Sequence, residues 1–234
     1  MLRLVYKNME LVTPDEVAKY KADWLELGYA LEIAPADLDE AEATIDELAE
    51  HHPPSATHTL RVSMDGAIMA IYMGLPAKWL YIAGAAHDDG KNHPLIRPLL
   101  RPGLFTPQDR ENMKPHATYG YKNALIKFNP TIAGMVIRVH TYLDNGYPAT
   151  VPPVPDGVDQ KIFLSAARLL GFADFQDATH RIDTNGILSS AQRIKKFLRV
   201  NPDYRDEINN LVQAYAVQTE PRLLRLAGTL LQQP

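Results

Sequence analysis

Cysteine is absent from this chain of 234 residues. Disulfides, thiolate metal ligands and cysteine nucleophiles are therefore excluded, and any bound metal must be held by imidazole and carboxylate groups. No stretch approaches the roughly 20 consecutive apolar residues that a membrane-spanning helix needs. The first residues also lack an apolar run of signal-peptide length. These absences predict a cytoplasmic protein that does not enter a membrane.

An excess of positive charge is missing as well. The 24 lysines and arginines stand against 28 aspartates and glutamates, which leaves a net charge of -4. The chain therefore offers no global electrostatic reason to expect a nucleic-acid polymer or an anionic membrane as partner. A small anionic substrate would need a local positive site. With 46% hydrophobic residues the chain can bury a real core, and one domain is the starting expectation.

Signals for helices recur along the chain, whereas alternating, strand-like runs are scarce. Thr13 and Asp37 each stand three residues before a glutamate, as in a capping box. Thr106 precedes a proline that suits the first position of another helix. The proline-rich segment 149–156 is expected to be a loop, and the leucine-rich segment 221–232 a closing helix. An all-α fold is the prediction.

Four of the eight histidines occupy positions that are unusual for surface residues. His58 is expected to open a helix, His87 ends the apolar run WLYIAGAA, His116 precedes a helix, and His140 follows IAGMVIRV. Asp88 comes directly after His87. An ionised aspartate at the end of an apolar helix is unfavourable to bury unless a cation or hydrogen-bond donors compensate it. Each histidine is thus a candidate metal ligand, with a packed core histidine as the alternative interpretation.

The order of these residues resembles the HD-domain phosphohydrolases, whose pattern is similar to His58, His87-Asp88 and Asp174. The region from His87 to Gly120 resembles in detail the HD-GYP branch, which hydrolyses cyclic di-GMP. The resemblance covers roughly residues 50–215. The similar pieces are HDDGK at 87–91, RPG at 101–103, Thr106 with Glu111, KPHATYG at 114–120, DNGYP at 144–148 and AARLLGFADFQDA at 166–178.

The resemblance implies an HD-domain helical bundle in residues 51–234, preceded by accessory helices in residues 1–50. It also implies a dinuclear metal site in the core of the bundle, with Asp88 bridging two divalent ions. Iron or manganese would be favoured, with zinc, nickel and magnesium as other candidates, because imidazole and carboxylate ligands suit all of them. A metal-activated water would attack the phosphodiester. In the implied ligand set, one ion is completed by His58, His87 and Asp174, and the other by His116 and His140.

Lys91 and a glycine-tyrosine-proline turn are the expected substrate-binding residues. Lys91 would act beside Asp88 in catalysis by offering an ammonium group to a phosphate oxygen or to the leaving group, although an exposed lysine is an equally ordinary interpretation. Gly146, Tyr147 and Pro148 line the substrate by resemblance alone. The family's basic substrate-binding residue is assigned to Arg181 despite a shortened interval. Asp89, which completes no expected ligand set, is predicted to be a solvated residue at a helix end.

Three positions depart from the HD-GYP pattern. Val139 stands where the first of two adjacent histidines is usual, and Thr141 replaces a glutamate. Pro54 occupies the position of a glutamate that relatives with three metals carry, so a third ion is not expected.

These features leave three hypotheses about function. The first is a phosphodiesterase for cyclic di-GMP or a related cyclic dinucleotide, and the second is an HD-class phosphohydrolase acting on another nucleotide. The third is a non-hydrolytic nucleotide-binding sensor. All three take a small anionic nucleotide. The first 50 residues are too few for a sensory domain, so control is expected to come from a homodimer or a regulatory protein partner.

Overall fold

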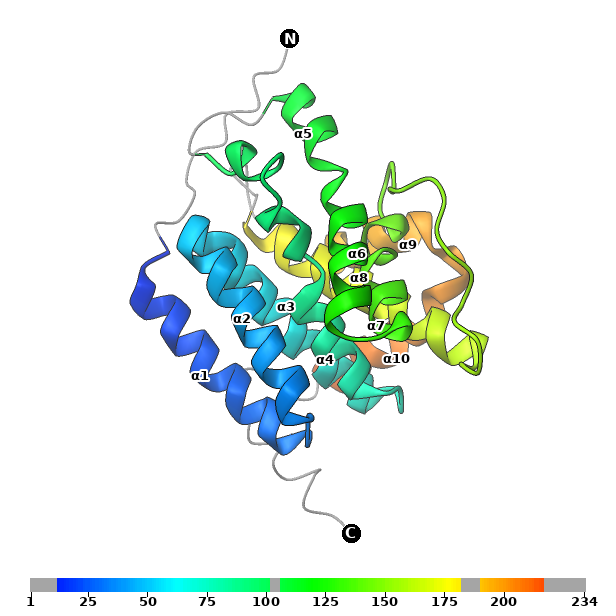
Figure 1. Cartoon of the computed structure of the whole chain (residues 1–234). Coiled ribbons are helices and arrows are strands. Elements are labelled where there is room, and N and C mark those ends of the chain that lie inside the picture. Colours follow the sequence, from blue (N-terminus) through cyan, green and yellow to red (C-terminus); the bar gives the residue numbers. More distant parts are fainter. Residues whose placement is uncertain (1–11, 102–105, 182–189, 217–234) are drawn as a thin grey trace.

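The structure, a computed structural model, describes residues 12–101, 106–181 and 190–216 (Figure 1). These residues form helices and no strand, which confirms the all-α prediction. Four short 3₁₀ helices are η1 Asp89–Asn92, η2 Arg97–Leu99, η3 Val139–Tyr142 and η4 Pro202–Tyr204. The α-helices are α1 Pro14–Ala30, α2 Pro35–His51, α3 Pro53–Tyr72, α4 Ala77–Ala86, α5 Pro107–Met113, α6 His116–Lys127, α7 Pro130–Val136, α8 Gln160–Arg181, α9 Ser190–Val200 and α10 Arg205–Ala216.

Two of the three expected helix starts are confirmed. Thr13 forms a capping box with Glu16 at the start of α1, and Thr106 does the same for α5. The expectation for Asp37 was wrong, because α2 begins at Pro35. A proline at the first helical position needs no donor there and has its φ already set for the helix, so it starts α2 without a side-chain cap.

The helix α3 runs through the middle of the bundle and packs against α1, α2, α4 and α8 (Figure 1). It lies very close to α4, since a Cβ atom on Gly84 would be 2.5 Å from the Cα of Ser63. Only glycine permits that approach. At the same residue of α3, the indole of Trp24 donates to Ser63 Oγ at 2.9 Å, and the Tyr81 hydroxyl of α4 donates to the Trp24 carbonyl at 2.7 Å. These bonds fix α1 to the α3–α4 pair.

The proline-rich segment 149–156 contains no helix, as predicted, and leads into α8. Arg138 donates hydrogen bonds to the carbonyls of Gly134, at 2.8 Å, and of Pro152, which ties this segment to α7. The leucine-rich helix expected at 221–232 lies outside the described residues. Among the helices that the structure does describe, none is both long enough and apolar enough to cross a membrane.

Candidate metal centre

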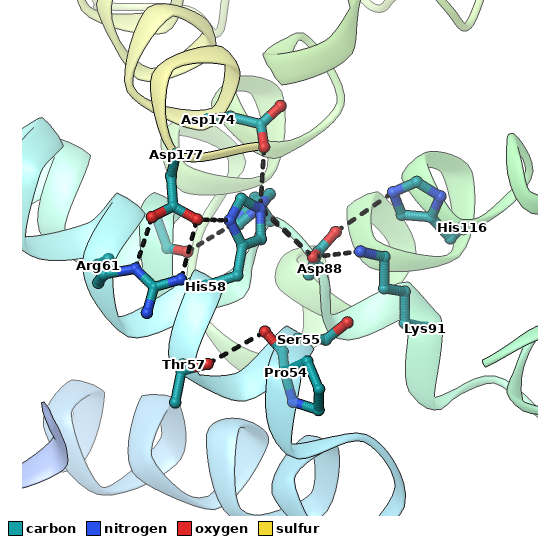
Figure 2. Close-up of polar contacts among 12 residues, drawn as sticks. Pro54, Ser55, Thr57, His58, Arg61, Asp88, Lys91, His116, Asp174 and Asp177 are labelled. Carbon is teal, nitrogen blue, oxygen red and sulfur yellow. Dashed lines mark hydrogen bonds and ion pairs between the residues drawn. The ribbon is translucent and has the colours of Figure 1, made fainter. Parts of the chain in front are cut away.

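The six expected ligands come from five parts of the chain and meet in the interior. Figure 2 shows His58, Asp88, His116 and Asp174 among them. His58 lies in the second turn of α3, so the expectation that it opens a helix was wrong. The pair His87-Asp88 joins α4 to η1, and His116 is the first residue of α6. His140 lies in η3 and Asp174 in α8. All six side chains are buried.

One group of ligand atoms, the first cluster, is formed by His58, His87 and Asp88. The two Nε2 atoms of the histidines are 3.3 Å apart. Asp88 Oδ2 lies 3.6 Å from His87 Nε2 and 3.9 Å from His58 Nε2. Asp174 Oδ1 borders this cluster, 3.0 Å from His58 Nε2 and 3.8 Å from His87 Nε2.

The second cluster is formed by Asp88, His116 and His140. Here the two Nε2 atoms are 2.9 Å apart, and Asp88 Oδ1 lies 3.4 Å from His116 Nε2. Asp174 Oδ2 is 3.3 Å from His140 Nδ1. Each aspartate therefore presents one oxygen to each side, and Asp88 belongs to both clusters.

Three of the histidines are held with Nε2 facing inward. His58 Nδ1 is 2.6 Å from Asp177 Oδ2, while His87 Nδ1 and His116 Nδ1 are each 2.7 Å from the backbone carbonyl three residues earlier. Those acceptors require a proton on Nδ1, so in a neutral ring the Nε2 lone pair points into the cluster. Burial lowers the pKa of His87 to about 4 and also lowers the pKa of His116. Both rings are therefore neutral at pH 7, the form that binds a metal.

Asp88 is the most deeply buried of the acidic ligands, with 0% exposure. Burial by itself would raise its pKa, but the Lys91 ammonium and the adjacent histidines hold the pKa well below its usual value. Within the described part of the chain, its Oδ1 atom accepts no hydrogen bond. A buried, ionised oxygen without a donor, surrounded by imidazole lone pairs, is stable only if a cation compensates it.

The distances fit that requirement. Two atoms that each lie about 2.1 Å from one divalent cation are about 3.0–3.5 Å apart. The facing Nε2 atoms are 3.3 Å apart in the first cluster, within this range, and 2.9 Å apart in the second, close to its lower end. The donors are nitrogen and oxygen without sulfur, which suits iron, manganese or zinc. These clusters could hold a metal.

Comparison with known families agrees with this chemistry. The family model described as HD domain matches residues 55–179. This chain belongs to the HD domain family. The match begins in α3 just before His58 and ends in α8 just after Asp177, so all six expected ligands lie within it. A search of curated proteins found no match. The HD domain implies a metal-dependent phosphohydrolase in general.

Two residues of the HD domain that the sequence interpretation missed support the first cluster. Asp177, one turn after Asp174 in α8, contacts His58 Nδ1 and also accepts from Arg61 Nε at 2.5 Å (Figure 2). Arg61 lies one turn after His58 in α3. Burial would raise the pKa of Asp177, but His58 and Arg61 lower it instead. The i, i+3 spacing on both helices is a signal from which these residues could have been found.

Lys91 and the expected turn both reach the clusters. Lys91 Nζ is 2.5 Å from Asp88 Oδ2, and its side chain is half-buried (Figure 2). The Tyr147 ring stacks on His140, with centroids 4.9 Å apart and an interplanar angle of 25°. It also meets His116 edge-on at 5.9 Å.

The glycine of the turn is required by its surroundings, because a Cβ on Gly146 would lie 2.4 Å from the Thr141 carbonyl oxygen. Pro148 follows Tyr147 in a stretch without helix. Arg181 ends α8, but its side chain lies outside the described part of the structure.

The positions that depart from the HD-GYP pattern have other roles here. Val139 has 0% exposure and is part of the apolar core, and the Thr141 hydroxyl donates to the Arg138 carbonyl at 2.7 Å. The expectation that Asp89 is solvated was wrong, because its exposure is 2%. Since η1 turns back against α6 immediately after Asp88, its first side chain is directed into the protein rather than into water.

Proposed function

We propose that this HD-domain protein is a phosphodiesterase that hydrolyses cyclic di-GMP or a related cyclic dinucleotide. The main support for this proposal is the position of Asp88, because its two oxygens border two clusters that each contain two imidazoles. A carboxylate shared in this way is the usual feature of a two-metal site. We therefore propose two divalent ions, with iron or manganese favoured over zinc, nickel and magnesium.

In the proposed ligand set, the first cluster together with Asp174 holds one ion and the second cluster holds the other. Two bound divalent cations would supply a water of lowered pKa as the nucleophile and would compensate the charge on the phosphate oxygens. Asp88 and Asp174 contribute two negative charges against four positive ones, so the pocket stays positive in a protein of net charge -4. That local charge attracts an anionic phosphodiester.

Lys91 and Asp88 are the proposed catalytic residues. The Lys91 ammonium lies beside the shared carboxylate, where it can move onto a phosphate oxygen or onto the departing alkoxide. Its half-buried position favours this role over that of an ordinary surface lysine. No side chain has to act as the nucleophile, which agrees with the absence of cysteine.

Tyr147 and its neighbours Gly146 and Pro148 are proposed to line the substrate. The Tyr147 ring covers the two histidines of the second cluster, so a nucleotide entering the clusters on that side would meet it. Arg181 is kept as the proposed basic residue for a second phosphate.

A different nucleotide substrate is the second candidate function, and a non-hydrolytic sensor is the third. Val139 and Thr141 favour them over cyclic di-GMP, because one is enclosed in the core and the other bonds to its own backbone. In the HD-GYP pattern a histidine is usual at position 139 and a glutamate at position 141, and neither Val139 nor Thr141 offers a metal-ligand atom like theirs.

A substrate screen on metal-free protein reconstituted separately with manganese and with iron under anaerobic conditions tests these functions. We expect linear or fully cleaved products from cyclic di-GMP, separated by chromatography. Unchanged cyclic di-GMP with turnover of another nucleotide would support the second function instead. Tight binding without turnover under every metal would support the sensor. A metal content well below one ion per chain would contradict both enzymatic functions.

A further inference from the structure

A second group of charges, centred on the buried carboxylate of Asp89, lies next to the metal clusters. Asp89 is only 2% exposed, although it follows Asp88 directly. Its Oδ1 accepts from Asn92 Nδ2 at 3.3 Å, and its Oδ2 is 3.3 Å from Lys127 Nζ. A carboxylate that is removed from water in this way is strongly destabilising unless its counter-charge is present.

Lys127 connects this carboxylate to two other elements. It stands at the C-terminal end of α6, where a cation is also favoured by the helix dipole. Its ammonium donates to Thr44 Oγ1 of α2 at 2.8 Å and lies 3.5 Å from Glu40 Oε1. Asn92 Nδ2 adds a bond of 3.4 Å to the Thr44 carbonyl. The pair therefore ties η1 to α2 and α6 at once.

The backbone beside Asp89 leaves η1 little room to move. A Cβ on Gly90 would lie 1.9 Å from the His116 carbonyl oxygen, so η1 and the start of α6 are already in contact there. Gly90 is held by that contact and Asn92, the last residue of η1, by its bond to α2, while Asp89 is the first residue of the helix. Asp88, the carboxylate shared by both clusters, is the residue immediately before this short helix.

We infer that the buried Asp89–Lys127 ion pair is a positioning device that sets where Asp88 lies between the two clusters. This inference rests on the proposed metal-dependent function. Ligand groups must be held within about 0.5 Å of their productive geometry. Asp89 does this through the backbone that it shares with Asp88. Lys127 does it by holding Asp89, from which it is 38 residues away in the chain. The α2 helix thereby takes part in building the metal centre.

Metal-free protein titrated with Mn²⁺ tests this inference, using Lys127→Met as the main variant. Lys127→Met keeps the length of the side chain and removes the charge, so Asp89 is left buried without its cation. We expect the Mn²⁺ affinity to fall about 10- to 100-fold, as for other outer supports of metal ligands. Lys127→Arg should stay within about threefold of wild type, because it retains the charge. An unchanged affinity in Lys127→Met overturns the inference.

The visible spectrum of the Co²⁺ form separates positioning from simple stabilisation. We expect Lys127→Met to alter the band intensity, which reports ligand geometry, at a temperature where circular dichroism shows a folded protein. The double variant Asp89→Asn/Lys127→Met should keep the altered spectrum, because it also lacks the ion pair, although it no longer buries an unpaired charge. A lower melting temperature with a wild-type spectrum would contradict positioning. If Lys127→Met does not fold, Asp89→Asn alone must weaken Mn²⁺ binding several-fold for the inference to stand.

Lys21→Met is the matched control. Lys21 also forms ion pairs with α2, at 2.7 Å from Glu42 and 2.8 Å from Asp46, but on the side of α2 that faces α1. The Mn²⁺ affinity and the Co²⁺ spectrum of Lys21→Met should equal those of the wild type. The inference is tested by Mn²⁺ binding and the proposed function by hydrolysis. A wild-type protein that binds Mn²⁺ but hydrolyses no nucleotide would contradict the proposed function and would leave the test of the inference intact.

Discussion

The two halves of the metal centre are supported in different ways. In the first cluster, His58 is held by the Asp177 carboxylate, which is in turn held by Arg61. In the second cluster, His116 is held by a backbone carbonyl, as His87 is in the first. His140 has the ligand Asp174 on its Nδ1 side and the Tyr147 ring against its face.

We expect this difference to separate a metal-holding side from a substrate-facing side. Carboxylate and guanidinium supports orient an imidazole firmly and make it more basic, so the first cluster should bind its ion more tightly. The second cluster has no carboxylate of this kind behind its histidines among the described residues. It is bordered instead by the Tyr147 ring, and the Lys114 ammonium lies 5.9 Å from the centre of that ring. We therefore expect loss of metal from variants of the first side and loss of substrate affinity from variants of the second.

The largest effect is expected for Asp88→Ala, which removes the only side chain common to both clusters. Metal loading should be abolished at both, whereas His87→Ala should abolish loading of the first cluster. Metal analysis of purified proteins, with circular dichroism as a check on folding, measures this. If Asp88→Ala retained metal and activity, the assignment of the centre would be wrong.

Asp177→Asn should weaken metal binding by about 10- to 100-fold, the usual effect of removing a carboxylate behind a ligand histidine. The loss should affect the first ion to bind, because the first cluster is the better supported one. Calorimetric titration with Mn²⁺ distinguishes the two binding steps. Asp144→Asn is the control, since Asp144 pairs with Arg199 at the surface. An equal loss in both variants would remove the distinction between the clusters.

Tyr147→Ala should leave metal content unchanged and raise the KM for the nucleotide about tenfold, equivalent to about 1.4 kcal/mol of lost binding. The reason is that the ring contacts the second cluster from outside without offering a ligand atom to it. Steady-state kinetics together with metal analysis test this. A variant that loses metal instead would show that the ring supports the cluster rather than the substrate.

The last effect concerns the stability of the metal-free protein and its dependence on pH. Burial holds the pKa of His87 at about 4, below its unfolded value of about 6.5. Between these two pH values, His87 is protonated in the unfolded chain and neutral in the folded chain. The metal-free protein should therefore lose stability as the pH falls from 6.5 to 4, by at most about 3 kcal/mol from this residue. Asp88 and Asp174, whose pKa values are held well below normal, add to the loss at lower pH.

His87→Gln cannot take up that proton, so its melting temperature in a chelator should depend less on pH across this range. His93→Gln, which lies outside both clusters, should keep the wild-type dependence. Parallel slopes for wild type and His87→Gln would show that the buried histidine is not the source of the acid sensitivity.

Local signals in the sequence predicted much of the fold and failed where packing decided. Thr13 and Thr106 cap helices as expected, because a capping box involves neighbours in the chain. Asp37 carries the same pattern and caps nothing, since Pro35 starts its helix earlier. The burial of Asp89 could not be predicted either, because its counter-charge Lys127 lies far along the sequence and reaches it only when α6 packs on η1.

The sequence by itself determined the helical class and, through its histidines and aspartates, the donor set of a candidate metal centre without sulfur. It did so because capping patterns, helical periodicity and ligand chemistry are properties of residue types and of short spacings. Only the tertiary structure decided that Asp88 belongs to both clusters, that Asp177 and Arg61 support one of them, and that Tyr147 covers the other. Those contacts join residues distant in the chain, so they exist only once the helices have packed around α3.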